Sequence, residues 1–339
     1  MKLQTNATST NFDEVLSLIV ASKQKALAQV NSILIELYWR IGEYISAKTI
    51  KENWGKGVVI ELAQFIQNKE PNIQGFTERN LWRMKQFYET YKDNSKLTPL
   101  VTQISWTNNL LIMSASKSDD ERAFYLNLSI KERYSKRELE RQISSGLYER
   151  TQIANQKLSA VVRVFPRDTL NVFRDSYALE FLGLPTVHSE MDLQKALVSS
   201  LKDFILEIGK DFCFMGQEYR LQVGDTDFSI DLLFFHRSLQ CMVVFELKID
   251  NFKPSYLGQL EFYLEVLDKH VKKEYENPSI GVLLCRKKDD EVVKFALNRS
   301  LSPTVISEYE TKLIPKEILQ RKLNELYEAF EIEDEIGKV

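Results

Sequence analysis

The run Cys241–Phe245 is apolar at every position, and it constrains the fold more than any other stretch of the chain. A strand that is apolar on both faces lies in the middle of a sheet whose two sides are covered. A turn at Arg237–Gln240 joins this run to a second oily strand, Phe228–Phe235, and a third strand is expected at Phe212–Val223. These patterns predict a three-stranded meander inside a larger, covered sheet.

Helical patterns surround the meander. The segment "EMDLQKALVSSLKDFILEIG" before it is amphipathic and closes at Gly209, and "PSYLGQLEFYLEVLDKH" after it opens at Pro254-Ser255. A strand at Ile280–Cys285, a further strand "TVISEY" and a final helix from Pro315 to about Phe330 follow. The order helix, three strands, helix, strand predicts an α/β domain with a mixed central sheet flanked by helices.

Up to about residue 150 the apolar residues recur at three- and four-residue steps, which predicts an all-α region. Residues 12–45 fit one long helix or two helices with a break. A helix around Lys56–Gln67, a turn at 71–75 and a helix from about Thr77 have the outline of a helix-turn-helix. A similar outline recurs from Ser118, and its second helix opens with a capping box, Ser135 followed by Glu138.

The length of 339 residues exceeds the usual domain size of about 100–200 residues, so two domains are expected. The predicted fold class is α+β overall. We place an α-helical domain at 1–150, a linker or adapter at 151–189, the α/β domain at 190–330 and an acidic tail at 331–339. The chain has no apolar run of about 18 residues and no apolar signal core at its N-terminus, so a cytoplasmic protein without a membrane partner is expected.

Formal charge divides unevenly, with +5 on residues 1–160 and −8 on residues 161–339. Because phosphate is neutralised by Lys and Arg, the first half is the better candidate for contacting nucleic acid, although an ordinary solvated surface explains the same surplus. The candidate nucleic-acid-binding residues are Arg79, Arg83 and Lys85 on the helix after Thr77, Lys136, Arg137 and Arg141 on or beside the helix after Ser135, and Lys253 in the second half.

Charged residues interrupt the two central strands at Asp231, Glu246 and Lys248. The two-residue period of a strand puts Glu246 and Lys248 on the same face. If Asp231 pairs with Glu246 across an antiparallel hairpin, the turn is centred on 238–239, which matches the turn residues present there. Three ionisable side chains would then meet at the rim of an oily sheet.

Buried carboxylates cost several kcal/mol unless something compensates their charge. Lys248 could balance one carboxylate of the pair, whereas a divalent cation balances both, and oxygen ligands suit Mg²⁺ or Mn²⁺. Such an ion would hold a phosphate oxygen and a water, with the lysine positioning or deprotonating that water or neutralising developing charge. This chemistry is phosphodiester hydrolysis. The alternative is a purely structural Asp/Glu/Lys ion-pair network at the sheet edge.

An acidic residue at the end of one strand and E-x-K on the next, within this order of elements, resembles the PD-(D/E)XK nuclease superfamily. The segments "IDLLFFHR", "FELKI" and "FKPSYLGQLEFYL" are similar in particular to the C-terminal nuclease domain of the YhcG-like proteins. The segments "LYWRIGEYI", "GFTERNLWRMKQFYETY" and "ISWTNNLLIM" resemble the helical N-terminal domain of that family. One departure is that Ile230 stands where the motif has proline.

The resemblance also implies roles for individual residues. It implies Asp231 and Glu246 as metal ligands, the Leu247 carbonyl as a further ligand, Lys248 as the catalytic lysine, Gln259 beside the site, and a glutamate from the preceding helix, for which Glu207 is the candidate and Glu190 the rival.

The function implied is a Mg²⁺- or Mn²⁺-dependent endonuclease acting on DNA, with the helical domain positioning nucleic acid. The family suggests a bacterial setting such as restriction, repair or defence against mobile elements, and cutting of both strands would suit a homodimer. The alternative is a noncatalytic DNA-binding or assembly protein that uses a nuclease-like domain as scaffold, and a third hypothesis is a helical protein–protein adapter. The complete Asp231, Glu246 and Lys248 set favours catalysis.

Overall fold

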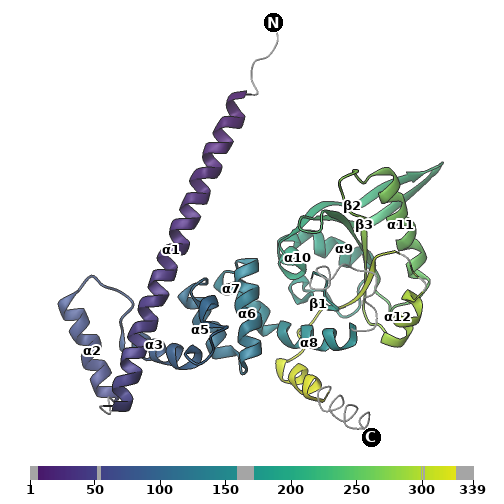
Figure 1. The fold of residues 1–339 in the computed structure, drawn as a ribbon. Helices are drawn as coiled ribbons and strands as arrows, with labels where there is room; N and C mark the ends of the chain where they lie inside the picture. Colours follow the sequence, from purple (N-terminus) through teal and green to yellow (C-terminus); the bar gives the residue numbers. More distant parts are fainter. Residues whose placement is uncertain (1–6, 52–54, 159–171, 299, 301, 326–339) are drawn as a thin grey trace. The chain divides into compact units, whose positions relative to one another are not determined.

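The computed structural model describes residues 7–51, 55–158, 172–298, 300 and 302–325 (Figure 1). The predicted acidic tail at 331–339 and part of the predicted linker lie outside these residues. The chain divides into two compact units, Met1–Glu140 and Arg141–Val339, which are described separately. None of the helices in the described ranges combines the length and hydrophobicity needed to cross a bilayer.

The first unit is helical and is organised around α1 (Ala7–Lys51), a single unbroken helix where the sequence allowed one or two. It packs against α3 (Glu78–Tyr91) through aromatic contacts, because the Trp39 ring lies edge-on to Phe87 and Tyr88 with centroids 5.9 and 5.1 Å apart. Gly42 permits this approach, since a Cβ at that position would collide with the Met84 carbonyl of α3.

The sequence predicts a helix-turn-helix outline for two helix pairs, and the structure gives the length of their turns. Between α2 (Lys56–Lys69) and α3 lie eight residues, 70–77, which is longer than the three- or four-residue turn of that motif. By contrast, α6 (Asp119–Glu132) and α7 (Lys136–Ser144) are joined by only three residues, and Arg133 takes the left-handed conformation there (φ 49°). The second pair therefore has a turn of the length found in that motif.

Short elements complete the first unit, and helix caps fix where its helices begin. The remaining helices are α4 (Thr98–Val101) and α5 (Trp106–Ala115). The predicted capping box of α7 is confirmed, because the Ser135 backbone N–H donates to Glu138 Oε2 at 2.7 Å and the Glu138 N–H donates to Ser135 Oγ at 3.4 Å. Thr77 caps α3 as expected.

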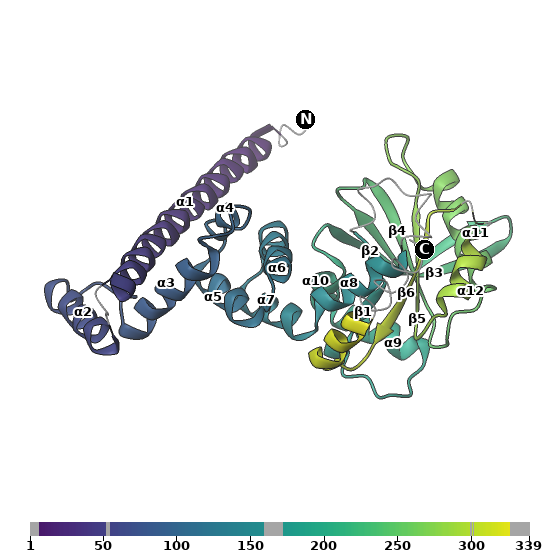
Figure 2. The same cartoon turned by 60° about the horizontal axis from the view of Figure 1, so that its bottom comes forward.

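The second unit contains a six-stranded mixed sheet in the order β1-β6-β5-β4-β3-β2 (Figure 2). Its strands are β1 (Ser176–Ala178), β2 (Phe212–Val223), β3 (Thr226–His236), β4 (Cys241–Leu247), β5 (Ile280–Cys285) and β6 (Thr304–Glu310). The meander β2-β3-β4 is antiparallel, and β4, β5, β6 and β1 are parallel. Every residue of β4 is buried, which confirms the prediction of an interior strand covered on both faces.

Helices cover the two faces of this sheet. On one face Leu193 and Phe204 of α9 (Glu190–Ser199) and α10 (Leu201–Ile208) join a core with Phe234 and Phe245. On the other face α11 (Tyr256–His270) packs, and its Leu260 lies so close to Gly281 of β5 that a Cβ there would clash. The predicted helix at 190–209 is thus two helices, which separate at Ser200.

Among the described residues of the second unit, four elements were not predicted from the sequence: one strand, two helices and a 3₁₀ turn. The strand β1 lies within the predicted linker and pairs with β6; three residues are too short for a strand pattern to show in the sequence. The helices α8 (Leu147–Leu158) and α12 (Asp290–Leu297) and the 3₁₀ turn η2 (Glu180–Leu182) were not expected as separate elements. A helix is present at 316–325, where the final helix was expected, and its buried Leu319 and Leu323 attach it to the fold.

Candidate active site

The β3-β4 hairpin brings Asp231 and Glu246 together. Leu232 pairs with Phe245 in the antiparallel register, so the next step along the ladder places Asp231 opposite Glu246, as predicted. The backbone N–H of Leu247 donates a hydrogen bond of 2.8 Å to Asp231 Oδ2. A residue missed by the sequence interpretation also holds this strand, since Gln194 Nε2 of α9 donates to the Asp231 carbonyl at 3.0 Å.

Lys248 completes the cluster at the end of β4. Its Nζ lies 3.0 Å from Glu246 Oε1 and 3.8 Å from Glu190 Oε2. The same ammonium group lies 5.6 Å from the centroid of the Tyr256 ring. One cation therefore faces Glu190, Glu246 and Asp231, so the negative charge at this rim exceeds the positive charge.

The pKa values report this imbalance. Burial, with the negative charge of Asp231 added to it, raises the pKa of Glu246 to about 7 despite its bond to Lys248. Burial also raises the pKa of Asp231, against the hydrogen bond from Leu247 and the charge of Lys248. Burial alone would lower the pKa of Lys248, but the charge and hydrogen bond of Glu246 raise it overall. Lys248 is thus a protonated, cationic group at neutral pH.

The oxygens of this cluster fit a hard divalent cation. Glu246 is only 2% exposed, and its Oε2 is buried without a hydrogen-bond partner in the described part of the chain. No group of three or more His, Cys, Asp or Glu side chains at metal-holding distance occurs among the described residues. A pair of carboxylates agrees with Mg²⁺, which typically binds one or two carboxylates and takes its other ligands from water and substrate phosphate.

The side chain of Gln259 forms a hydrogen bond with Tyr263. Both residues lie on α11, and Gln259 Nε2 donates to the Tyr263 hydroxyl at 2.7 Å. Burial raises the pKa of Tyr263, and the charges of Glu246 and Asp231 add to this shift. Gln259 therefore orients the hydroxyl of Tyr263, whose pKa is raised in part by the charges of both carboxylates. Tyr263 is a residue that the sequence interpretation did not name.

The structure does not bring Glu207 to this cluster. It lies on α10, is fully buried, and forms ion pairs of 3.0, 3.2 and 3.1 Å with Arg141, Arg150 and Arg174. Its Oε1 also accepts a 2.9 Å hydrogen bond from the N–H of Ala178 in β1, and β6 and β5 separate that strand from β4. The glutamate that approaches Lys248 is Glu190, the rival candidate.

Three arginines reverse the effect of burial at Glu207. Burial would raise the pKa of this carboxyl, but the charges of Arg174, Arg150 and Arg141 lower it to about 2. Arg141 is itself held by Glu180 at 2.9 Å, so the expectation that it is available to nucleic acid is corrected. Its guanidinium is fully engaged in the fold of the second unit.

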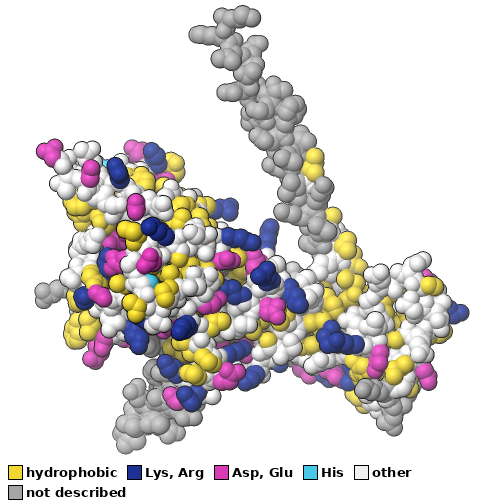
Figure 3. All heavy atoms as spheres, turned by 180° about the vertical axis from the view of Figure 1, so that it is seen from behind, with side chains coloured by type: hydrophobic (Ala, Val, Ile, Leu, Met, Phe, Trp, Pro, Cys, Tyr) yellow, Lys and Arg dark blue, Asp and Glu magenta, His cyan; other side chains and the backbone are white. Residues whose placement is uncertain are grey.

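The other predicted nucleic-acid-binding residues occupy separate places. In the first unit Arg79 is exposed on α3 and Arg83 half-buried, whereas Lys85 is paired with Glu89 at 2.8 Å. Lys136 and Arg137 are exposed in the first turn of α7. In the second unit, Lys253 is exposed and paired with Asp250 at 2.9 Å. On the face shown in Figure 3, basic and acidic side chains are interspersed rather than gathered in one patch.

Comparison with known proteins shows the family to which the chain belongs. Residues 170–324 match the family model described as the YhcG PDDEXK nuclease domain, and residues 14–150 match the DUF1016 N-terminal domain. The second unit therefore contains a PD-(D/E)XK nuclease domain. "Putative nuclease YhcG" of Escherichia coli (strain K12) is 31% identical over 340 residues, with 89% of each chain covered. The chain belongs to the YhcG family.

Solved structures resemble part of the chain at low identity. A repair endonuclease from Pyrococcus abyssi matches with 16% identity and a TM-score of 0.26, over 38% of this chain and 49% of that one. EndoMS in its apo form matches with 20% identity and a TM-score of 0.25, over 38% of this chain and 48% of that one. The chain spans about half the length of these solved chains, and the match is too slight to carry an argument.

Proposed function

We propose that the chain is a divalent-metal-dependent endonuclease that hydrolyses phosphodiester bonds in DNA. The observation that carries the proposal is the under-compensated pair Asp231 and Glu246, in which a buried carboxylate oxygen has no partner in the described structure and the pKa of Glu246 is raised to about 7. Membership of a nuclease family supports the same reaction class.

Each residue of the cluster has a role in this proposal. Asp231 and Glu246 would hold Mg²⁺ or Mn²⁺, and the Leu247 carbonyl remains a predicted further ligand. The bound ion would polarise a phosphate oxygen and lower the pKa of a water. Lys248, protonated and fixed 3.0 Å from Glu246, would neutralise charge that develops on the phosphate rather than take a proton from water.

The helical unit would position the nucleic acid. Arg79, Lys136 and Arg137 are exposed, and none has an ion-pair partner within the described residues. Lys136 and Arg137 also follow the short turn between α6 and α7, whose length is that found in a helix-turn-helix. We therefore favour α7 over α3 as the element that contacts the phosphate backbone, and Lys136→Ala with Arg137→Ala should weaken DNA binding more than Arg79→Ala with Arg83→Ala.

The test of the main proposal is cleavage by the purified chain. Supercoiled and linear duplex DNA, with a matched RNA duplex, are incubated with Mg²⁺ or Mn²⁺ and, separately, with chelator. Cutting of DNA that requires the ion and disappears in Asp231→Ala is the expected result. Retention of DNA without cutting, unaffected by chelator, would instead support the noncatalytic scaffold, and preferential cutting of RNA would overturn the choice of DNA.

A further inference from the structure

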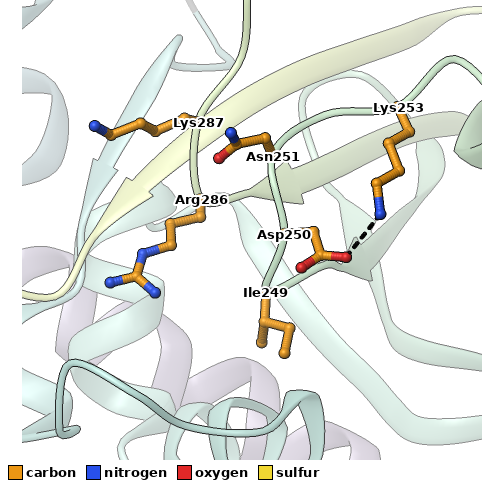
Figure 4. Close-up of a pocket in the computed structure, with 6 residues that line it drawn as sticks. All are labelled: Ile249, Asp250, Asn251, Lys253, Arg286 and Lys287. Atoms are coloured by element: carbon orange, nitrogen blue, oxygen red, sulfur yellow. Dashed lines mark hydrogen bonds and ion pairs between the residues drawn. The ribbon is translucent and has the colours of Figure 1, made fainter.

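A cavity of about 550 Å³ opens directly beyond the E-x-K segment. It is lined by Ile249, Asp250, Asn251, Lys253, Arg286 and Lys287 (Figure 4). These residues come from the segments that continue β4 and β5 beyond the ends of the two strands, where Asn251 and Lys287 form an isolated parallel bridge. The Arg286 N–H donates to the Asp250 carbonyl at 3.1 Å and the Phe252 N–H to the Lys287 carbonyl at 2.8 Å, so the backbone of the cavity is fixed.

The cations of this cavity are not equivalent. Lys253 is paired with Asp250 at 2.9 Å, and Figure 4 shows it on the other side of the 249–251 segment from Arg286 and Lys287. Neither Arg286 nor Lys287 has a carboxylate within ion-pair distance among the described residues. The single carboxylate of the lining, Asp250, is already paired with Lys253. Outside the lining, the charges of Arg286 and Lys287 act on Glu310 from beyond ion-pair distance, so both cations keep hydrogen-bond donors for an anion.

The neighbouring Lys288 differs from Arg286 and Lys287 because its charge is paired within the fold. Its side chain is only 5% exposed, pairs with Asp175 and donates to the Ile306 carbonyl at 2.8 Å. Of three consecutive basic residues, one is therefore used by the fold and two line the cavity. The guanidinium of Arg286 can bind two oxygens of one phosphate at once, and Lys287 can add a point charge.

The position of the cavity limits which phosphate it would meet. Its lining begins at Ile249, three residues past Glu246, which is at most about 10 Å at the rise of an extended strand. A duplex advances about 3.4 Å per nucleotide along its axis, so this distance corresponds to no more than about three nucleotides. A strand whose scissile phosphate lies at Asp231 and Glu246 can therefore pass the cavity with a nearby phosphate.

We propose that Arg286 and Lys287 bind a backbone phosphate of the substrate strand within about three nucleotides of the bond that is cut. This inference rests on the proposed nuclease function. The pocket holds the strand in register over the carboxylates, and it does so without reading base sequence, because phosphate contacts position a strand and base contacts specify it.

The first experiment measures DNA binding in chelator, where no bond is cut. A fluorescent 30-base-pair duplex is titrated with wild type, with the double variant Arg286→Ala/Lys287→Ala, and with the control Lys269→Ala/Lys294→Ala. The control removes two exposed lysines of the same domain that do not line the cavity. We expect the pocket variant to raise Kd about tenfold and to reduce the slope of log Kd against log salt by about one, with the control near wild type. Equal slopes and affinities in all three proteins would overturn the inference.

The second experiment separates this inference from the proposed function. Cleavage with Mn²⁺ should show a raised KM and a nearly unchanged kcat in Arg286→Ala/Lys287→Ala. The variant Arg286→Lys should bind DNA more tightly than the double variant but less tightly than wild type, because lysine cannot contact two oxygens of one phosphate at once. Cutting by wild type with the same KM in the pocket variant would refute the pocket and leave the nuclease standing. A wild type that cuts no DNA would refute the nuclease, and the binding data would still decide whether the pocket holds phosphate. Matched thermal unfolding of all variants excludes a folding defect.

Discussion

Two buried glutamates of the same unit show opposite ways of handling a buried charge. Glu207 is fully buried, three arginines surround it, and its pKa falls to about 2. Glu246 is 2% exposed, Lys248 is its single bonded cation, and its pKa rises to about 7. Both side chains are buried, so the neighbouring charges decide the sign of the shift: three arginines lower the pKa of Glu207, whereas the negative charge of Asp231 opposes the single lysine at Glu246.

The comparison distinguishes Glu207, whose ionised carboxylate stabilises the fold, from Glu246, whose ionised carboxylate destabilises it. Around Glu207 the attraction of the arginines offsets the cost of removing charge from water. Around Glu246 part of that cost remains, and the added charge of Asp231 increases it. A side chain that lowers stability where it stands is a candidate for function, because perturbed carboxylates of this kind concentrate at catalytic sites.

The largest effect is expected from neutralising Glu246. Glu246→Gln should reduce the rate of DNA cutting by at least about 10³-fold, because it removes a proposed metal ligand. In chelator the free energy of unfolding should stay level or rise, since the repulsion with Asp231 is removed. Single-turnover cleavage and urea unfolding measure the two quantities. A stable variant that still cuts at the wild-type rate would remove Glu246 from the reaction.

The opposite pattern is expected at Glu207. Glu207→Gln should lower the free energy of unfolding by about 3–5 kcal/mol, because it removes the buried carboxylate that three arginines share, and of these Arg141 keeps Glu180 as a partner. The folded fraction should cut DNA within a few-fold of the wild-type rate. Glu180→Gln is the matched control, since among the described residues that carboxylate pairs with Arg141 and it is 21% exposed, so its loss should be smaller. A stable but inactive Glu207→Gln protein would restore Glu207 to the catalytic set.

The pH dependence of stability should follow from the same glutamate. The folded pKa of Glu207, about 2, lies below its ordinary value of 4.5, so its ionised form stabilises the fold. This contribution is complete above about pH 4.5 and disappears as the pH falls toward 2, a loss of about 3 kcal/mol at 1.36 kcal/mol per pH unit. Urea unfolding from pH 7 to pH 2.5 should show the gap between wild type and Glu207→Gln closing. A gap independent of pH would mean that packing rather than charge holds this cluster.

Divalent ions should stabilise the site of Asp231 and Glu246 and not that of Glu207. At a Mn²⁺ concentration about a hundred times Kd, binding adds about 2.7 kcal/mol to the free energy of unfolding. Thermal unfolding with Mn²⁺ and with chelator should show this gain in wild type and in Glu207→Gln, but not in Glu246→Gln. Calorimetric titration of Mn²⁺ gives the same answer directly. Equal gains in all three proteins would place the ion elsewhere.

Local rules were enough to predict the hairpin. The short turn at Arg237–Gln240 fixes the register of β3 against β4, and that register alone puts Asp231 opposite Glu246. The full burial of β4 followed from its unbroken apolar run. Both inferences use residues close together in the chain, where turn length and the two-residue strand period leave little freedom.

The choice between Glu207 and Glu190 could not be made in the same way. The sequence reads as one helix from 190 to 209, and the separation at Ser200 changes the directions in which its two ends point. Glu207 is fixed by arginines at 141, 150 and 174, which are 33 to 66 residues away along the chain. Contacts this distant leave no periodic signal. The strand β1, whose N–H group binds Glu207, was missed because it has only three residues.

The smallest effect is expected at Glu190, and it tests whether α9 contributes to the acidic cluster. Its carboxylate is 47% exposed and 3.8 Å from Lys248, so water screens most of its charge. Glu190→Gln should lower the cutting rate by about tenfold or less and change stability by less than about 0.5 kcal/mol. Asp203→Asn, an exposed acid on α10, is the control for loss of one negative charge. If both variants cut at the wild-type rate, the site consists of the hairpin residues alone; if only Glu190→Gln slows, the first turn of α9 supplies the glutamate that the sequence assigned to Glu207.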